Sequence, residues 1–169
     1  MSENFCHLHV HDEFSLLDGL GTAAEYVKKA VENNQSSLCI TNHANNDGAI
    51  KFQKEAKIAG IRPIFGAELY LVEDIHIKEK GENRKHITIL VRNTTGWKNL
   101  NKMLTIANFE GFYHRPRISP EILCKHIDGL IISTACSSSF ITENWGEKLL
   151  QEISSLIPEY VFMEIMPHK

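Results

Sequence analysis

The chain has 169 residues and a mass of 19.2 kDa, which is the size of one domain. Hydrophobic residues make up 43 % and charged residues 23 %, and these values exclude a disordered or fibrous chain. The formal charge of −3 gives no overall field that would hold a polyanion, so any contact with nucleic acid must be local or supplied by a partner. The unusual number is nine histidines, three of which lie within residues 7–11.

The sequence offers no feature of a membrane or secreted protein. No apolar run approaches the ~20 residues that span a bilayer, and residues 1–4 do not begin a signal peptide. The four cysteines form no C-x-x-C pair, which argues against a zinc ribbon or a thioredoxin-like motif. Cys6 and Cys39 lie in apolar, strand-like runs and are predicted to be buried thiols. We therefore expect a reducing, cytoplasmic compartment and no membrane partner.

Strand-like and helix-like segments alternate along the chain. Residues 5–10 predict a strand, and Thr22 with Glu25 forms the capping box of a helix that reaches about Asn33. The later elements are predicted, in chain order, as a strand over 38–41, a helix capped by Asp47 and ended by Gly60, a strand over 63–72 broken at Gly66, an exposed loop over 73–85, a strand over 86–91, a helix opening at Thr94 or Thr95, a short helix capped by Ser119, a strand over 129–133, a helix over 147–156 and a strand near 160–165.

Repeated strand–helix units with apolar strands predict an α/β fold with a largely parallel sheet covered by helices. The sheet is predicted to be either an open, doubly wound sheet or a closed barrel. The phosphate-binding glycine fingerprints of the open sheet, G-x-G-x-x-G and the Walker motif, are absent.

Polar residues gather where the predicted strands end. His9 and His11 end the first strand, and at period two they point to the same side, so two imidazoles can bind one ion. The others are Asp18 in the following loop, Asn42 and His43 after the second strand, Glu68 within the third, and Cys136 after the fifth. In parallel α/β folds the functional site lies at the carboxyl ends of the strands. His86 begins a strand instead of ending one, so the residues alone leave its place at this rim open.

Each of these residues also has a plain structural interpretation. An H-x-H pair is common on surfaces, a lone His43 or His86 is more often structural than a ligand, and Cys136 is most often a small buried residue. Glu68 in an apolar strand is more telling, because an unpaired buried carboxylate costs several kcal/mol. Together, imidazoles, carboxylates and a thiol suit Zn²⁺, Mn²⁺ or Fe²⁺, and such a site can activate water and stabilise charge on a phosphoryl oxygen.

Five segments carry a resemblance to a known family. Residues 7–19, His-Leu-His-Val-His-Asp-Glu-Phe-Ser-Leu-Leu-Asp-Gly, closely resemble the opening motif of the polymerase-and-histidinol-phosphatase (PHP) domain. Residues 40–43 and 64–68 resemble its second and third motifs, and residues 129–136 also match. Residues 111–117, Gly-Phe-Tyr-His-Arg-Pro-Arg, are similar to a segment typical of the branch found at the N-terminus of bacterial DNA polymerase III alpha subunits.

The resemblance implies a fold, a metal site and its ligands. The family fold is a distorted (β/α)7 TIM-like barrel with up to three divalent metal ions, Zn²⁺, Mn²⁺ or Fe²⁺, while Mg²⁺ serves the parent polymerase. The ligands implied at positions of this sequence are His9, His11, Asp18, His43, Glu68, His86 and Cys136. Among them His9, His11, His43 and Glu68 are expected to be catalytic. Some family members have lost these ligands, whereas this chain keeps all seven types, so it resembles a metal-competent member.

Two features depart from the family pattern. Asn42 stands where the family usually has Asp, and we expect this change to weaken the electrostatics beside the ligand His43. Seven strand–helix units of roughly 30 residues need about 210 residues, and a final Asp-x-His ligand pair has no counterpart before Lys169. We therefore expect residues 1–169 to form a single PHP domain that is incomplete at its C-terminus, as the N-terminal part of a longer alpha subunit.

Three functions follow from the resemblance. The first is a metal-dependent phosphoesterase, as a 3′–5′ exonuclease proofreading module in DNA replication whose partners are DNA, reached through the parent polymerase, and the rest of the alpha subunit. The second is a non-catalytic structural module that binds the proofreading exonuclease subunit, which the missing Asp-x-His pair and Asn42 favour. The third is a free-standing phosphatase of the histidinol-phosphate type, which the polymerase-like residues 111–117 disfavour.

Overall fold

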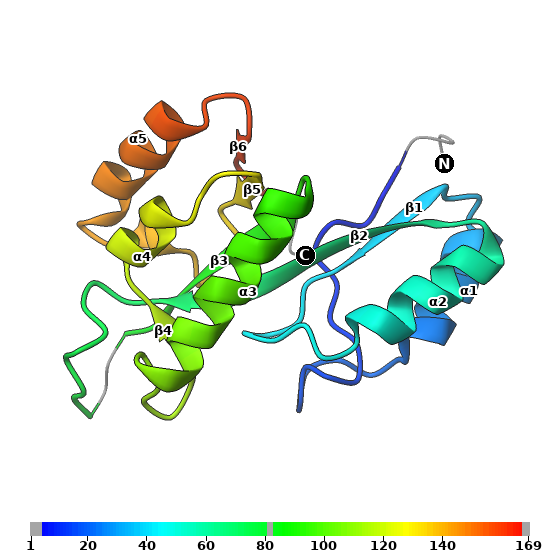
Figure 1. Cartoon of the computed structure of the whole chain (residues 1–169), viewed down its shortest axis with the longest axis horizontal. Helices are drawn as coiled ribbons and strands as arrows, with labels where there is room; N and C mark the ends of the chain where they lie inside the picture. The colour runs from blue at the N-terminus through cyan, green and yellow to red at the C-terminus, as the bar shows by residue number, and fades with distance from the viewer. Residues whose placement is uncertain (1–4, 81–82, 167–169) are drawn as a thin grey trace. The chain divides into compact units, whose positions relative to one another are not determined.

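The computed structural model describes residues 5–80 and 83–166. The chain divides into two compact units, Met1–Ala67 and Glu68–Lys169, and the division falls within one long strand, β2 (Arg62–Leu71). Figure 1 shows the elements of both units along the chain.

The first unit is built on a parallel pair of strands covered by two helices. β1 (Ser37–Ile40) pairs with the beginning of β2 in a register that runs from Ser37 opposite Arg62 to Ile40 opposite Phe65. Helices α1 (Ala23–Glu32) and α2 (Ala49–Ala59) lie side by side over these strands (Figure 1). The buried apolar residues between the layers are Ala23, Val27, Ala30, Leu38, Ile40, Phe52, Ala56 and Ile61.

Most helix ends of this unit lie where the neighbouring residues in the sequence predict them. The capping box of Thr22 and Glu25 forms as predicted, and Gly60 ends α2 in the left-handed conformation at φ 72°. Asp47 does not cap α2, because the helix begins one residue later and Gly48 occupies the N-cap position without a side-chain hydrogen bond. The break predicted at Gly66 is also wrong, since β2 runs through this residue without interruption.

The second unit holds a mixed sheet with helices packed on it. Its strands follow the order β2, β3 (Lys85–Val91), β5 (Leu130–Ser133) and β6 (Val161–Phe162), and the short β4 (Arg117–Ile118) pairs with β2. The β2–β4 and β5–β6 pairs are parallel, and β3–β5 is antiparallel. The helical segments are α3 (Thr94–Phe109), α4 (Pro120–Lys125), the 3₁₀ turn Phe140–Thr142 and α5 (Gly146–Leu156).

The predicted α/β class, with mainly parallel strand pairs, is confirmed, and closure into a barrel stays a prediction. The exceptions to the predicted elements are local. Residues 5–10 form no regular strand, and Cys6 is half-buried instead of buried. Cys39 is buried as expected, and burial raises the pKa of its thiol well above the ordinary value. Within residues 5–80 and 83–166, no helix combines the length and apolar character that a membrane span requires.

A buried arginine fixes the segment that leads into β3. Arg117 is fully buried, and its guanidinium donates hydrogen bonds to the carbonyl oxygens of Gly111 at 2.8 Å, Ile77 at 2.9 Å and Ile75 at 2.6 Å. The loop predicted over 73–85 is mostly exposed, but Ile75 is buried beside this guanidinium. Three donors in a fixed planar geometry therefore hold a loop whose other end is the start of β3.

The substitution Arg117→Lys tests this anchor. One ammonium group cannot match the planar fork, so buried carbonyls lose donors at a cost of about 1–3 kcal/mol each. We expect the free energy of unfolding in urea to fall by at least about 2 kcal/mol. Arg115→Lys is the control, because Arg115 is exposed and two residues away; equal stability of the two variants would contradict the anchoring role.

Candidate metal centre

The segment that carries the first histidines lies beside β1 without being a regular strand. Its backbone accepts hydrogen bonds from β1 and the residue after it, with Cys39 N donating to His7 O at 3.0 Å and Thr41 N to Val10 O at 2.8 Å. The hydroxyl of Thr41 accepts the N–H of Val10 at 3.0 Å, in the place of a backbone carbonyl. The bonded residues His7 and Val10 are three positions apart whereas Cys39 and Thr41 are two apart, so the two segments do not form a regular ladder, and residues 5–10 are not a strand.

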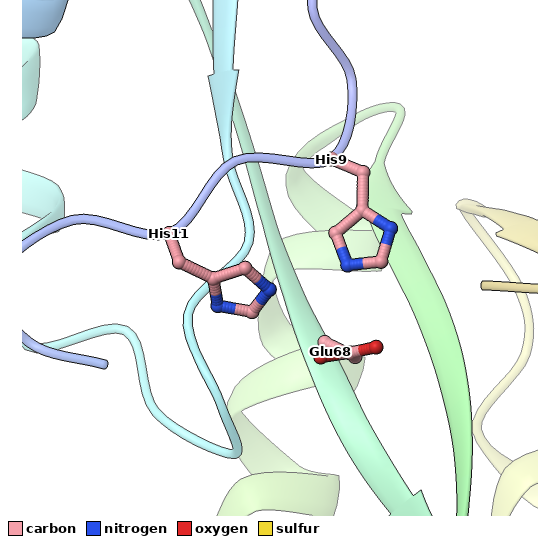
Figure 2. Close-up of side chains that lie close together, drawn as sticks. All are labelled: His9, His11 and Glu68. Atoms are coloured by element: carbon pink, nitrogen blue, oxygen red, sulfur yellow. The ribbon is translucent and has the colours of Figure 1, made fainter. Parts of the chain in front are cut away.

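His9 and His11 lie next to each other on this segment. Their ring centroids are 5.2 Å apart with an interplanar angle of 52°. Figure 2 shows these two imidazoles, which the N-terminal segment carries, together with the carboxylate of Glu68, which belongs to β2. The predicted proximity of the two histidines is therefore present in the first unit.

Three predicted ligands come together within the first unit. One donor atom from each of His11, Asp18 and His43 lies within 4.8 Å of the other two. Nε2 of His43 is 3.0 Å from Oδ2 of Asp18, and the rings of His11 and His43 stack with centroids 4.2 Å apart. Ligands at 2.0–2.2 Å from a tetrahedral metal ion are about 3–4 Å from one another, so this set of two imidazoles and a carboxylate fits a divalent cation.

A tight turn presents the Asp18 carboxylate to the two imidazoles. The N–H groups of Asp18 and Gly19 both donate to Ser15 O, at 3.0 and 2.9 Å, and Leu17 adopts a positive φ of 71°. A Cβ on Gly19 would lie 1.9 Å from the carbonyl oxygen of Asp12. Only glycine therefore allows the backbone to pass this close.

The substitution Gly19→Ala should open this turn. The methyl group meets backbone and not a movable side chain, so we expect a loss of about 1–3 kcal/mol in urea unfolding and displacement of Asp18. Gly21→Ala is the matched control, because its Cβ would meet only the ring of Tyr26, at 3.0–3.4 Å, and that ring can move. If both variants keep the stability of the unmodified chain, the close approach is not a constraint.

Glu13 connects the loop that carries Asp18 to helices α1 and α2 through its carboxylate. Its carboxylate accepts the N–H of Ala23 at the start of α1 at 3.1 Å and pairs with Lys51 of α2 at 2.7 Å. Burial alone would raise the pKa of Glu13, but the hydrogen bond and charge of Lys51, with backbone hydrogen bonds, outweigh it and lower the pKa below the ordinary 4.5. The stability from this carboxylate is therefore present above pH 4.5 and lost as the pH falls through the lowered value.

The substitution Glu13→Gln should reveal this pH dependence. At pH 7 we expect a loss of at most about 1 kcal/mol, because both partners reach solvent. The difference from the unmodified chain should shrink as urea unfolding is repeated at pH values falling below 4.5. Glu159→Gln, at an exposed position, should show no such trend, and a constant difference at all pH values would refute the assignment.

Three buried polar residues contact the set of His11, Asp18 and His43; Asn42 was expected to affect the electrostatics beside His43, whereas Asp12 and Ser15 were not predicted to have a role. Asp12, Ser15 and Asn42 are each at most 2 % exposed. Asn42 Oδ1 accepts from the N–H of Asp12 at 3.0 Å and lies 2.8 Å from Ser15 Oγ, while Asn42 Nδ2 donates to Asp12 Oδ1 at 2.6 Å. Ser15 Oγ in turn contacts His11 Nδ1 at 2.8 Å and accepts the N–H of His43 at 3.1 Å. Apart from lying between or beside predicted ligands, these residues carry no feature in the sequence that marks them.

The second unit brings together three further predicted ligands, Glu68, His86 and Cys136. Glu68 in β2 is 2 % exposed, and its Oε1 is 2.9 Å from Nδ1 of His86. Cys136 Sγ lies 3.3 Å from the same nitrogen, and the N–H of Ser138 donates to this sulfur at 3.4 Å. The three donor atoms lie within 4.8 Å of one another. Carboxylate, imidazole and thiol at these separations form a donor set typical of Zn²⁺.

The strand direction explains why His86 belongs to this group. β3 runs antiparallel to β5, with Thr88 opposite Ser133, so the first residues of β3 meet the last residues of β5. The N–H of His86 donates to Ser138 O at 2.9 Å, which holds the loop that carries Cys136. The start of one strand and the end of another thus share one edge, and the question left open by the sequence is resolved.

A cavity elsewhere in the second unit does not contain these ligands. It has a volume of about 770 Å³ and is lined by charged residues of α3, α4 and the segment after β2, among them Glu73, Lys102, Glu110 and Lys125. Glu68, His86 and Cys136 are not among its lining residues. The candidate metal ligands of the second unit therefore lie outside this cavity.

The family model for the PHP domain matches residues 7–168. The chain belongs to the PHP domain family. DNA polymerase III subunit alpha of Borreliella burgdorferi is 44 % identical over 141 residues, which are 81 % of this chain and 12 % of that protein. The Helicobacter pylori (strain 26695) subunit is 35 % identical over 188 aligned residues, 99 % of this chain and 16 % of that protein. This PHP domain therefore spans less than a fifth of the length of these relatives.

Solved structures show a weaker likeness. An amidohydrolase from Chromobacterium violaceum aligns with a TM-score of 0.45 and 24 % identity, over 60 % of this chain and 32 % of that chain. The assignment to the PHP family rests on the sequence match, which covers nearly the whole chain.

Proposed function

We propose that this PHP domain is a metal-dependent phosphoesterase that belongs to a DNA polymerase III alpha subunit and hydrolyses phosphodiesters at DNA 3′ ends. The observation that carries the proposal is the set of Glu68, His86 and Cys136, three residues from separate elements whose donor atoms lie within 4.8 Å of one another. The set of His11, Asp18 and His43 supports it. The names of the relatives supply the polymerase context.

Seven residues would hold the metal ions. They are His9, His11, Asp18, His43, Glu68, His86 and Cys136. Their nitrogen, oxygen and sulfur donors suit Zn²⁺, Mn²⁺ or Fe²⁺. When bound, such ions activate water at neutral pH and neutralise the charge that develops on a phosphoryl group.

The chain's own residues prepare this chemistry by holding the donors in place. Glu68 keeps a carboxylate in a buried position beside His86, where a cation offsets its desolvation. Asp18 pairs with Nε2 of His43, and Ser15 contacts Nδ1 of His11. Donors held by second partners in this way lose little freedom when an ion binds. His9, His11, His43 and Glu68 are the residues to which we assign the catalytic roles.

In our proposal, a partner binds the DNA and delivers it to this site. The formal charge of −3 does not attract a polyanion to the chain as a whole, so we assign that role to the rest of the alpha subunit. The competing function, a scaffold for the proofreading exonuclease subunit, requires no metal and no hydrolysis. Metal binding and hydrolysis therefore separate the two.

Metal affinity is the first test. Cys136→Ser should weaken Zn²⁺ binding, measured by calorimetric titration of the metal-free chain, by at least about tenfold, because a thiolate ligand is lost. Cys124→Ser is the matched control: burial raises the pKa of the Cys124 thiol to about 11, so it stays protonated and is a poor ligand at neutral pH. Equal affinity of the two variants would remove Cys136 from the centre.

Hydrolysis is the second test. With Mn²⁺ or Zn²⁺ added, we expect release of nucleotides from a 3′-labelled single strand, and its loss in His11→Ala and Glu68→Gln but not in His76→Ala, an exposed histidine. A folded chain that binds no metal and hydrolyses neither DNA nor a small phosphate ester would favour the scaffold function. Hydrolysis of histidinol phosphate but not of DNA would favour the phosphatase alternative.

A further inference from the structure

We propose that Asn42 is a positioning residue that fixes the tautomer of His11, so that Nδ1 carries the proton and Nε2 presents its lone pair as the ligand atom. The part of this inference that concerns metal rests on the proposed function. The part that concerns the proton rests only on hydrogen bonds within the first unit.

The orientation of the Asn42 amide follows from two partners with unambiguous roles. The backbone N–H of Asp12 can only donate, so the Asn42 atom 3.0 Å from it is the oxygen. The Asp12 carboxylate, which also accepts the N–H of Phe14 at 3.0 Å, receives the amide nitrogen at 2.6 Å. A flipped amide would place oxygen against carboxylate and nitrogen against N–H, and both contacts would be lost.

The amide orientation then determines the roles around Ser15. Asn42 Oδ1 accepts only, so the Ser15 hydroxyl must donate its single proton to it across 2.8 Å. The N–H of His43 donates to the same hydroxyl oxygen at 3.1 Å, which agrees with an oxygen that serves as acceptor.

The last step concerns His11. Its Nδ1 is 2.8 Å from Ser15 Oγ, and 3.9 Å from the nearer oxygen of Asp18, which is beyond hydrogen-bond distance. Because the Ser15 proton is already donated to Asn42, this contact requires a proton on Nδ1 of His11. In the neutral ring the lone pair is then on Nε2.

Asparagine at position 42 suits these hydrogen bonds better than aspartate would. An aspartate there would accept the Ser15 proton in the same way, but its carboxylate would face that of Asp12 at the 2.6 Å that now separates an amide nitrogen from a carboxylate oxygen. Asn42 supplies the same acceptor to Ser15 and a donor to Asp12. The buried Asp12 carboxylate keeps a negative charge in this cluster, next to the Asn42 amide.

The tautomer of His11 can be measured directly in the metal-free 169-residue chain. Long-range ¹H–¹⁵N correlation spectra at alkaline pH distinguish the protonated nitrogen of a neutral imidazole, and His11→Gln assigns the signal. We expect Nδ1–H in the unmodified chain and in Asn42→Asp combined with Asp12→Asn, which keeps an acceptor for Ser15 without facing carboxylates. In Asn42→Ala the Ser15 proton is released to Nδ1, and we expect a shift toward Nε2–H.

A residue that only stabilised the fold would lower stability without moving the tautomer. Nε2–H in the unmodified chain overturns the inference, and so does an unchanged tautomer in a folded Asn42→Ala. If Asn42→Ala does not fold, the unmodified chain and the double variant still decide, since Nε2–H in either contradicts the argument. Zn²⁺ titration of the same samples is a separate readout: absence of metal binding in all of them would defeat the proposed function and leave the tautomer result standing.

Discussion

The side-chain amide of Asn42 is the interaction on which the first unit's ligands depend. It lies at the end of β1 and makes three hydrogen bonds to residues 12–15, one of them to a buried carboxylate. Buried polar groups of this kind must be paired or they cost stability. The pairing therefore fixes residues 12–15, the part of the segment between His11 and Asp18.

In the second unit, the direction of the strands brings the candidate ligands together. An all-parallel arrangement would place the start of β3 and the end of β5 at opposite edges of the sheet. The antiparallel β3–β5 pair instead brings Lys85 and His86 to the edge where Ser133 leads into the Cys136 loop. The hydrogen bond from His86 N to Ser138 O then fixes that loop. One reversal of strand direction thus supplies two of the three donors in the triad.

Sequence reasoning predicted best where the signal is local. Thr22 with Glu25, Gly60 and the Ser119–Pro120 pair mark helix ends by the chemistry of a few neighbouring residues, and the structure places all of them as expected. It failed where a distant group decides. Residues 5–10 have the pattern of a strand, but their hydrogen bonds to residues 39 and 41, one of them between positions 31 apart, do not keep the regular spacing of a ladder. The role of Arg117 was equally invisible, because its acceptors Ile75 and Ile77 are about forty positions away.

The candidate ligands also divide into residues that the sequence marks and residues that only distant contacts reveal. His-x-His spacing, polar residues after predicted strands and a carboxylate in an apolar strand are visible in the sequence, and six of the seven ligands implied by the family resemblance lie in the two triads. Asp12 and Ser15 could not be predicted, because small polar residues between ligands have no distinguishing pattern until their partners are known. His86 needed the direction of a strand, which periodicity does not report.

The two triads differ in how strongly the protein itself depends on a cation. Asp18 is half-exposed, with 54 % of its side chain accessible, so water screens its charge whether or not an ion is bound. Glu68 is 2 % exposed, where a carboxylate is costly unless a cation or hydrogen-bond donors compensate for lost hydration. The thiol of Cys136 beside the same imidazole adds a donor that binds soft cations best as a thiolate. Of the two triads, Glu68, His86 and Cys136 therefore contain the more strongly desolvated carboxylate, and a divalent ion bound there would compensate for that desolvation.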